Sequence, residues 1–482
     1  MKKQSTSEIF CQAILELKVN NSKALANLVM ALSSCTTAKS VVGLSVSALY
    51  HFQYSSICDV ISNLAKDKES YDIVSAIIED FCLTHRSKKS ERVYFQSDGV
   101  SIFREHSPTL EGRKQVYKPN NVISCNKPLG LGYTFSFINW GDSANSWSLP
   151  YKMKRLLAEE NLLDVAAQQI SEVCKHVFFK DNLVVNVCDS GYGNARYLSK
   201  THKIGNLVSI TRLRYGKKVY LVNENKGNIG APKIYGKKIY ISQATGSKTY
   251  HKKDSVYVVE QESIYDTLAH ERLTTIEKTS KGRELRVELY RWNNLLMRSK
   301  DGNNMKDAPF DLVGIQVFDL KSGERIFNRD IFLALEGIQK SKIELIESFE
   351  AYRHRFDLEV QNRFEKQNMF METFQSPDRQ HIENWMLVMM LSCWLLYVAA
   401  PDVEHVCQKW QIYSEPKQVD GALKSISQVR KGAEQLFATF DKSPFLPQSR
   451  KKGKGRQKGQ SQVKRQRFKV VKKEQKMKIS SA

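Results

Sequence analysis

The chain has 482 residues, of which 41% are apolar, and it carries a formal net charge of +23 with a sequence pI of about 9.4. So much apolar side chain excludes an intrinsically disordered protein, and the length predicts two to four folded units. The positive charge indicates a polyanionic partner. In a soluble chain it favours nucleic acid over a membrane surface, without distinguishing DNA from RNA.

The nine cysteines are scattered, without the CxxC or His-Cys spacings of zinc sites, so we expect buried thiols in a reducing compartment. The N-terminus lacks the apolar segment of a secretory signal. The apolar run Trp385–Ala400 has 16 residues, whereas a membrane span needs about 20, and it contains Ser392 and Cys393. We therefore expect a buried core helix, no membrane partner, and a cytoplasmic, nucleoid-associated protein.

Residues 1–88 place apolar side chains three and four positions apart in successive stretches, which predicts a bundle of helices. A compact helical domain ahead of a catalytic domain suits sequence-specific DNA binding. The alternative is a packing or dimerisation module, because none of these helices has an obvious recognition face.

Residues 89–214 predict the first part of a catalytic core. Aromatic and β-branched residues from Arg92 onward indicate strands, and a helix follows over Tyr151–Val177. A continuous apolar strand then ends at Asp189, before a short helix around Ala195–Ser199 and a further strand over 206–214. This order predicts an α/β domain with a mixed sheet.

The next segments complete that core around an insertion. Over residues 215–310, short strand-like pieces alternate with Gly, Lys and Asn turns, which favours a separate β-rich insertion. Residues 311–442 predict the second part of the core. That part begins with a strand over Asp311–Lys321, and the stretch from Asp330 to about Phe374 is almost wholly helical.

Residues 443–482 form a basic tail. Between Arg450 and Lys478 it has fourteen Lys or Arg residues and one acid, Glu474. Because few apolar residues separate these charges, we expect a disordered tail that attracts the DNA backbone. The alternative is a tail that is merely solvated.

Two aspartates stand close to strand ends. Asp189 ends the apolar run LVVNVC and precedes the turn SGYG, and active-site groups of open α/β sheets gather at such carboxyl ends of strands. Asp98 lies in YFQSDGVSIF, where a carboxylate is awkward to bury without a partner, although a turn aspartate before Gly99 is an equal interpretation. Carboxylates at such positions can hold the magnesium ions that activate a nucleophile and neutralise a leaving oxygen in phosphodiester cleavage.

One predicted helix combines four polar side chains on a single stripe. At about 100° per residue, Tyr352, Arg355, Glu359 and Lys366 fall within an arc of about 60°. A carboxylate between two cations suits metal coordination beside phosphate contacts, and the alternative is a solvated face with ordinary salt bridges. An adjacent apolar face is expected to pack into the core. Its residues are Phe349, Phe356, Val360 and Phe364.

The spacing Tyr352, Arg355, Glu359, Lys366 resembles the YREK signature of bacterial insertion-sequence transposases of the DDE class. Asp189 in DSGYG is similar to the second acid of that family. Asp98, which precedes Asp189 by 91 residues, resembles its first acid in order and spacing. The similarity spans roughly residues 93–410, and the YREK spacing is its most specific part.

This resemblance implies an RNase H-like catalytic core that binds two Mg²⁺ ions, with Mn²⁺ as a substitute. Asp98, Asp189 and Glu359 would be the catalytic metal ligands. It also implies a homodimer on paired transposon ends, acting on double-stranded DNA by cut-and-paste transfer. Tyr352, Arg355 and Lys366 would contact phosphates beside the cleaved end.

Three further residues are candidate DNA contacts. Trp292 lies in the expected insertion, where the family can stack an aromatic ring on an extruded base, although a core tryptophan is an alternative. Arg212 and Arg214 alternate along a strand and are interpreted either as DNA contacts or as ordinary arginines of an edge strand.

The sequence therefore predicts a DNA transposase that binds terminal inverted repeats, cleaves transposon ends and joins them to target DNA. Two alternatives remain: a domesticated, non-catalytic DNA-binding protein, and an RNase H-like nuclease that cuts without strand transfer. The three acids argue against a decayed copy.

Overall fold

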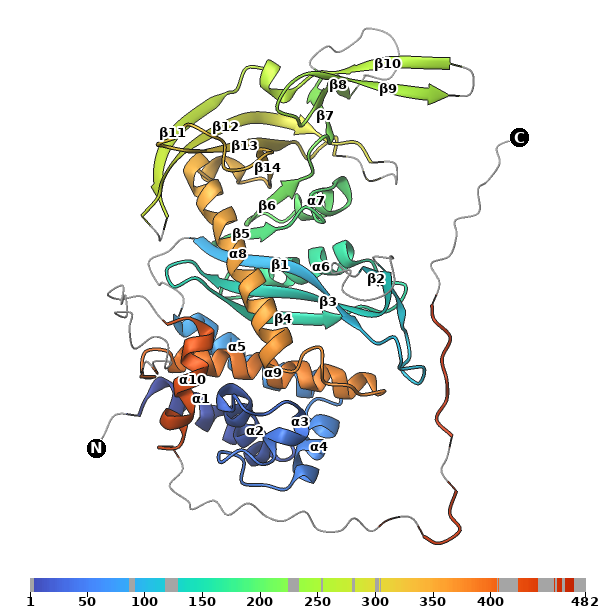
Figure 1. Cartoon of the computed structure of the whole chain (residues 1–482), viewed down its shortest axis with the longest axis vertical. Coiled ribbons are helices and arrows are strands. Elements are labelled where there is room, and N and C mark those ends of the chain that lie inside the picture. Colours follow the sequence, from blue (N-terminus) through green and yellow to red (C-terminus); the bar gives the residue numbers. More distant parts are fainter. Residues whose placement is uncertain are drawn as a thin grey trace. The chain divides into compact units, whose positions relative to one another are not determined.

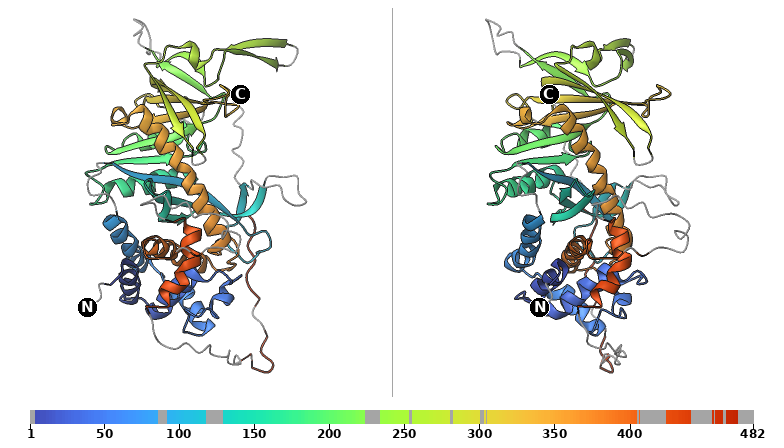
Figure 2. Two further views of the ribbon diagram at one scale, coloured as in Figure 1. Left: turned by 60° about the vertical axis from the view of Figure 1, so that its left-hand side comes forward. Right: turned by 90° about the vertical axis from the view of Figure 1, so that its left-hand side faces the viewer.

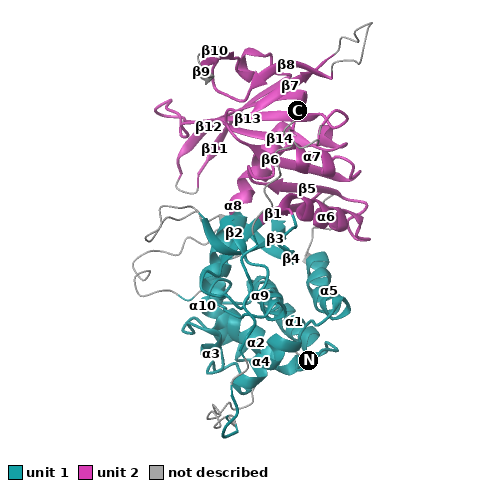
Figure 3. Cartoon of the chain, turned by 90° about the vertical axis from the view of Figure 1, so that its right-hand side faces the viewer, with its two compact units in different colours: residues 1–86, 99–160, 357–482 teal, residues 87–98, 161–356 magenta. Residues whose placement is uncertain are grey.

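A computed structural model of the chain describes residues 4–85, 92–117, 129–223, 234–252, 255–279, 282–299, 305–404, 424–440, 457–461 and 464–471, with the single residues 303, 406 and 455. The chain divides into two compact units, shown in Figure 3. Unit 1 comprises residues 1–86, 99–160 and 357–482, and unit 2 comprises residues 87–98 and 161–356. Helices and strands occur in both units, so the predicted mixed α/β class is confirmed.

Unit 1 contains a helical bundle built from both ends of the chain. The predicted helices of the N-terminal region are present, and they pack around a helix from the C-terminal region, as Figure 1 shows. The bundle is therefore not confined to residues 1–88. Its helices are α1 (Thr6–Leu15), α2 (Ser22–Ser34), α3 (Val41–Leu44), α4 (Tyr54–Asn63), α5 (Lys68–His85), α9 (Arg379–Ala399) and α10 (Ile426–Phe437).

Helix α9 is the core of this bundle. Asp378 caps its N-terminus by accepting hydrogen bonds from the backbone N–H groups of Gln380 and His381. By length and composition α9 is apolar enough to cross a membrane, but 94% of its most apolar window is buried inside the protein. The indole of Trp394 donates to the Pro150 carbonyl at 2.9 Å and stacks on Trp140. The predicted core helix is thus confirmed.

The strands of unit 1 include one that the sequence analysis assigned wrongly. Strands β2 (Lys114–Tyr117), β3 (Leu129–Asp142) and β1 (Arg92–Phe103) follow one another in the order β2-β3-β1, and β4 (Trp147–Arg155) pairs with β3. Residues 151–155 were predicted to be helical, yet they belong to β4. From Tyr151 to Arg155 buried and partly buried side chains alternate, and this period of two specifies a strand.

Unit 2 is organised by a large mixed sheet. Its strand order is β1-β5-β6-β14-β13-β12-β7-β8, with β11 also paired to β12. The contacts of β5 with β1 and β6 are parallel, and the other recorded pairings are antiparallel. The strands are β5 (Leu183–Cys188), β6 (Leu207–Leu213), β7 (Lys218–Val222), β8 (Tyr235–Tyr240), β11 (Glu271–Lys278), β12 (Glu284–Leu296), β13 (Phe310–Asp319) and β14 (Ile331–Glu336).

The region 215–310 differs from the separate insertion that its turns predict. Its strands β7, β8, β11 and β12 belong to the main sheet of unit 2, and only the hairpin of β9 (Gly246–Lys252) and β10 (Ser255–Gln261) forms a sheet of its own. Residues 331–336 were predicted to be helical but form β14. This short run is buried on both faces, and a continuous apolar run does not distinguish a strand from a helix by its period.

Helices cover both faces of the unit 2 sheet, as Figure 2 shows. On one face lie α6 (Leu162–Lys175) and α7 (Ala195–Thr201), which pack in one apolar cluster. On the other face lies the first half of α8 (Leu345–Asn368), whose residues up to Phe356 belong to unit 2. The 3-10 turns Ile264–Asp266 and Lys340–Lys342 complete the secondary structure.

The tail was predicted to be disordered, and part of it is paired. Much of residues 443–482 lies outside the described residues. Within the described part, Phe468 donates its backbone N–H to the Pro108 carbonyl at 2.9 Å, and Val471 donates to the Arg113 carbonyl at 2.8 Å. Residues 464–471 therefore contact residues 108–113, which lead into β2.

A buried carboxyl lies between α8 and α9 in unit 1. The side chain of Glu365 is fully buried, accepts a hydrogen bond from the Gln361 amide at 2.8 Å and lies beside the Cys393 thiol. Burial raises the pKa of Glu365 from 4.5 to about 7, while the Gln361 hydrogen bond opposes this shift. The carboxyl is therefore neutral in mildly acidic solution.

We predict that unit 1 loses stability as the pH rises from about 4.5 to about 7. The folded state binds the Glu365 proton more tightly than the unfolded state, so its contribution is complete below the unfolded pKa and is lost as the pH passes the folded pKa. At about 1.4 kcal/mol per pKa unit, the change is about 3 kcal/mol. Urea unfolding at several pH values, followed by circular dichroism, measures it.

Glu365→Gln is the matched variant because it resembles the neutral carboxyl in shape. Its unfolding free energy is expected to vary less with pH over this interval than that of the wild-type chain. Identical pH profiles for the two proteins would contradict the prediction.

Candidate active site

Asp98 and Asp189 are neighbours on adjacent parallel strands in unit 2. The register of β1 and β5 ends with Ser97 opposite Cys188, so Asp98, which lies within β1, comes next to Asp189, the first residue after β5. Because the two strands run parallel and in register, the next residue on each occupies a neighbouring position. Both side chains are partly exposed.

The side chains of β1 show which face of the sheet Asp98 occupies. The Tyr94 hydroxyl donates to the Glu347 carboxylate at 2.8 Å, and the Gln96 amide donates to the His354 carbonyl at 2.8 Å. Both partners belong to the unit 2 part of α8. Since side chains of a strand alternate between faces, Asp98 continues the series on the face that α8 covers.

The turn after Asp189 is fixed by its own hydrogen bonds. The backbone N–H of Gly191 donates to the Asp189 carboxylate at 2.8 Å, and the Asn194 amide donates to the Gly191 carbonyl at 2.8 Å. Asn194 also accepts from the Tyr197 N–H and so caps helix α7. At Gly193 a Cβ atom would overlap the carbonyl oxygen of Arg212, so only glycine permits this approach to β6.

Positive charges lie beside this turn. The Lys217 ammonium donates to the Gly193 carbonyl, and burial together with the Arg214 charge lowers the pKa of Lys217 to about 8. Arg212 follows Thr211, which is opposite Cys188 in the register of β5 and β6, so Arg212 is the next position beside Asp189. The side chains of Arg212 and Arg214 are exposed, as a DNA contact requires.

Two details of this basic group differ from the sequence analysis. Strand β6 lies between β5 and β14 and is not the edge strand that was assumed for Arg212 and Arg214. Lys217 was not among the predicted site residues. The sequence signal for it is the glycine turn at Gly216, which has a positive φ of 76° in the structure.

The pKa of Tyr192 is shifted by the charges around it. Its side chain is buried, and its hydroxyl has no hydrogen-bond partner in the part of the chain that the structure describes. Burial raises the pKa of Tyr192 most, Asp98 and Asp189 raise it further, and the Arg355 guanidinium lowers it. The phenol is therefore within the electrostatic reach of both aspartates and of Arg355.

The four YREK residues lie on one continuous helix, α8, as the sequence predicts. Tyr352 packs against the apolar cluster of unit 2, and Arg355 is partly buried in the same unit. Glu359 follows Arg355 by one turn and is exposed on the part of α8 that belongs to unit 1. Lys366 lies 3.6 Å from the Glu372 carboxylate.

The predicted apolar face of α8 is only half correct. Phe349 packs into the core and Phe364 is buried, but Phe356 is 57% exposed and Val360 is 42% exposed. The helix buries polar side chains, among them Glu365, on another stripe. Apolar periodicity identifies the buried face only where buried positions are apolar.

Trp292 is a core residue. Only 1% of its surface is exposed, its indole donates to the Thr267 carbonyl at 2.9 Å, and its ring stacks on Tyr290. The edge of Tyr265 covers it as well. In this conformation it is not available to stack on a DNA base, so the core interpretation replaces the DNA contact.

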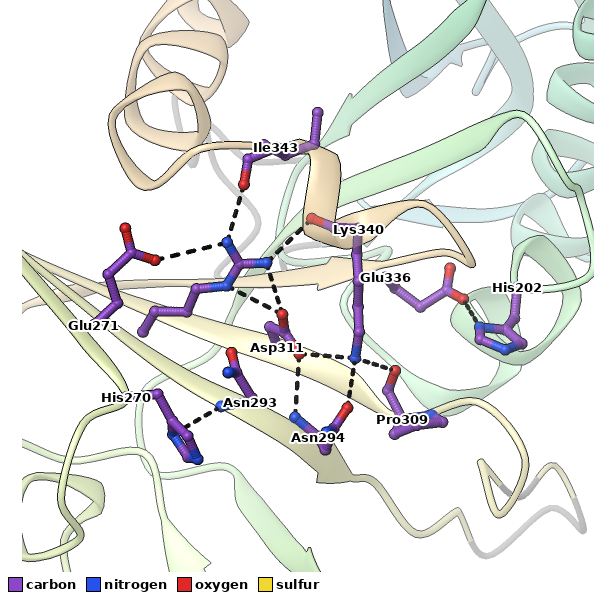
Figure 4. Close-up of polar contacts among 11 residues, drawn as sticks. His202, His270, Glu271, Asn293, Asn294, Pro309, Asp311, Glu336, Lys340 and Ile343 are labelled. Atoms are coloured by element: carbon purple, nitrogen blue, oxygen red, sulfur yellow. Dashed lines mark hydrogen bonds and ion pairs between the residues drawn. The ribbon is translucent and has the colours of Figure 1, made fainter.

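A buried ionic network supports the segment that leads into α8 (Figure 4). Arg291 and Asp311, both almost fully buried, are joined at 2.7 Å, and Lys340 contacts the same carboxylate at 2.7 Å. The Arg291 guanidinium also donates to the carbonyls of Lys340 and Ile343. It thereby fixes the backbone two residues before α8 begins.

The same network holds a bulge in β12. The backbone N–H of Asn294, which has a positive φ of 56°, donates to the Asp311 carboxylate at 3.1 Å. The Asn294 side chain accepts from the Lys340 ammonium at 3.0 Å, as Figure 4 also shows. Because one buried carboxylate receives two cations and a backbone donor, its charge is compensated.

The carboxylate pair fits a divalent cation in part. Asp98 and Asp189 offer the oxygen ligands that Mg²⁺ and Mn²⁺ prefer. Among the residues that the structure describes, no three His, Cys, Asp or Glu side chains are grouped so that they could hold a metal ion. The strand register thus brings together two of the three carboxylates that the sequence predicts to be metal ligands.

No protein-family model matches the chain, and no curated protein matches it either.

We predict that Gly193→Ala destabilises unit 2 by about 2–4 kcal/mol, because the added methyl would displace the Arg212 backbone. Gly205→Ala is the matched control, since a Cβ atom at Gly205 meets nothing within 4 Å. The unfolding free energies of the two variants are measured in urea. Equal stabilities would show that the turn yields without strain.

Proposed function

We propose that this protein is a DDE-type DNA transposase. In this proposal it binds the terminal inverted repeats of its element, cleaves the transposon ends and joins them to target DNA. The single observation that carries the proposal is the register of β1 and β5, which sets Asp98, within β1, beside Asp189, the first residue after β5. The YREK spacing supports the proposal independently. It places a carboxylate and two cations, which suit phosphodiester chemistry, on a different element, helix α8.

The third carboxylate in the proposal is that of Glu359. It stands one helical turn after Arg355, whose charge acts on Tyr192 together with those of Asp98 and Asp189. We propose that Asp98, Asp189 and Glu359 hold two Mg²⁺ ions, or Mn²⁺ in their place. The ions would supply activation of the attacking water or 3′-hydroxyl and neutralise charge on the leaving oxygen.

The cationic side chains of the chain have a separate role in this proposal. Arg355 grips phosphate oxygens with its planar guanidinium, while Lys366 acts as a point charge and Tyr352 donates a hydrogen bond. Arg212 and Arg214 add exposed positive charge beside the turn of Asp189. These residues orient the DNA backbone, and orientation contributes a large part of the catalysis of phosphoryl transfer.

An RNase H-like core is the finer fold assignment that we propose. A mixed sheet with helices on both faces in unit 2 supports it. The proposal includes a homodimer that pairs two transposon ends and acts in the cytoplasm at the nucleoid.

A non-catalytic DNA-binding protein is the second candidate. It is favoured by the absence, among the described residues, of a group of three side chains able to hold a metal ion. An RNase H-like nuclease without strand transfer has the same ligands as the transposase, so only the reaction products distinguish the two.

The decisive experiment incubates the full chain with the terminal repeats of its own element, target DNA and Mg²⁺ or Mn²⁺. Strand-transfer products support the transposase. Cleavage without joining overturns it in favour of the nuclease, and binding without either reaction overturns it in favour of the non-catalytic protein.

We predict that Glu359→Gln abolishes cleavage and leaves binding to the terminal repeats largely unchanged, because it removes a ligand charge with little change of shape. Glu350→Gln is the matched control. It makes the same change on the opposite side of α8, where the side chain is exposed. Gel-based cleavage and mobility-shift assays measure both properties, and wild-type cleavage by Glu359→Gln would refute the metal assignment.

A further inference from the structure

The C-terminal segment 464–471 contacts the residues that lead into an edge strand of unit 1. Strand β2 is the last strand in its order, and an edge strand offers unpaired backbone groups. Val471 forms a parallel bridge with Lys114 of β2, and Val471 and Phe468 donate to the carbonyls of Arg113 and Pro108. The segment is therefore held by two backbone hydrogen bonds to residues 108–113 and by one bridge to the first residue of β2.

The side chains of this segment divide by polarity. Phe468 and Val470 are partly buried, whereas the cations between and before them are exposed. No ion pair with an acid of the described residues engages these cations. They are Lys464, Arg465, Arg467 and Lys469. We call these four residues the basic strip.

We propose that the basic strip is a DNA-backbone contact surface held in place by the backbone contacts of residues 464–471 with residues 108–114. The inference deepens the proposed function, since it takes duplex DNA as the polyanion that the protein handles. Lys and Arg side chains neutralise phosphates and release counterions, which is the physical basis of such contacts.

Because the segment is already docked, its basic residues lose less conformational entropy when they bind DNA. A disordered tail must be ordered when it binds, and that ordering offsets part of the attraction to phosphate. A segment that is already paired avoids much of this loss and presents its charges at a fixed place on unit 1.

The first test asks whether the segment is docked in the full chain. Val471→Pro removes the N–H that donates to Arg113, while Val471→Ala retains it. Trypsin cleavage after Arg465, Arg467 and Lys469 is expected to be slow in the wild type and in Val471→Ala, and several-fold faster in Val471→Pro. Equal cleavage rates in all three proteins would overturn the docking.

The second test measures binding of a short fluorescein-labelled DNA duplex of arbitrary sequence at several salt concentrations. Substituting glutamine for the four residues of the basic strip is expected to reduce the slope of log K against log salt by roughly three to four. The matched control substitutes glutamine for Arg450, Lys451, Lys452 and Lys454 of the same tail, and a clearly smaller reduction is expected. Equal reductions would mean that position in the tail is irrelevant.

Two further arms exclude other partners. A labelled single-stranded RNA and vesicles with anionic lipid are tested under the same conditions. Stronger dependence on the basic strip for either of them would overturn the assignment to DNA. Glu359→Gln is expected to retain the wild-type salt slope, so failure of the catalytic proposal and failure of the strip are distinguishable.

Discussion

The register of the parallel strands β1, β5 and β6 is the constraint on which the candidate site depends. All six residues of β5 are buried, so its side chains pack against neighbours on both faces of the sheet. On the face away from α8, Ser97 donates to Asn186 at 2.9 Å and Asn186 donates to the Tyr197 hydroxyl at 2.7 Å. Because side chains alternate, a slip of one residue would turn Asp98 to the wrong face.

The position of α8 in unit 2 is set at two places. Arg291 and Asp311 fix the backbone that enters the helix, and Gln96 contacts the His354 carbonyl further along it. Buried ion pairs contribute little net stability when compared with apolar packing, but removing one partner is strongly unfavourable. In this protein these contacts fix the position of α8, and they thereby hold Tyr352 and Arg355 at a defined place on the sheet.

The elements that have a strong local pattern could be predicted from the sequence. The run LVVNVC followed by DSGYG specifies a buried strand and a turn, and α9 is recognisable from its unbroken apolar composition. Features that depend on contacts between residues distant in the sequence could not be predicted. Trp292 was given a candidate surface role although Tyr290 and Thr267 enclose it, and Lys217 is separated from Asp189 in sequence. The contact of residues 464–471 with residues 108–114 was not predicted, because the high charge of this segment is typical of a disordered tail.

The bundle around α9 has a consequence for biosynthesis. Helices α1 to α5 end at His85, while α9 begins at Arg379, so about 300 residues are translated before the N-terminal helices meet their central partner. At roughly 5–20 residues per second this takes on the order of 15–60 seconds. During that interval the apolar faces of the first helices emerge from the ribosome uncovered, which makes them a natural substrate for chaperones.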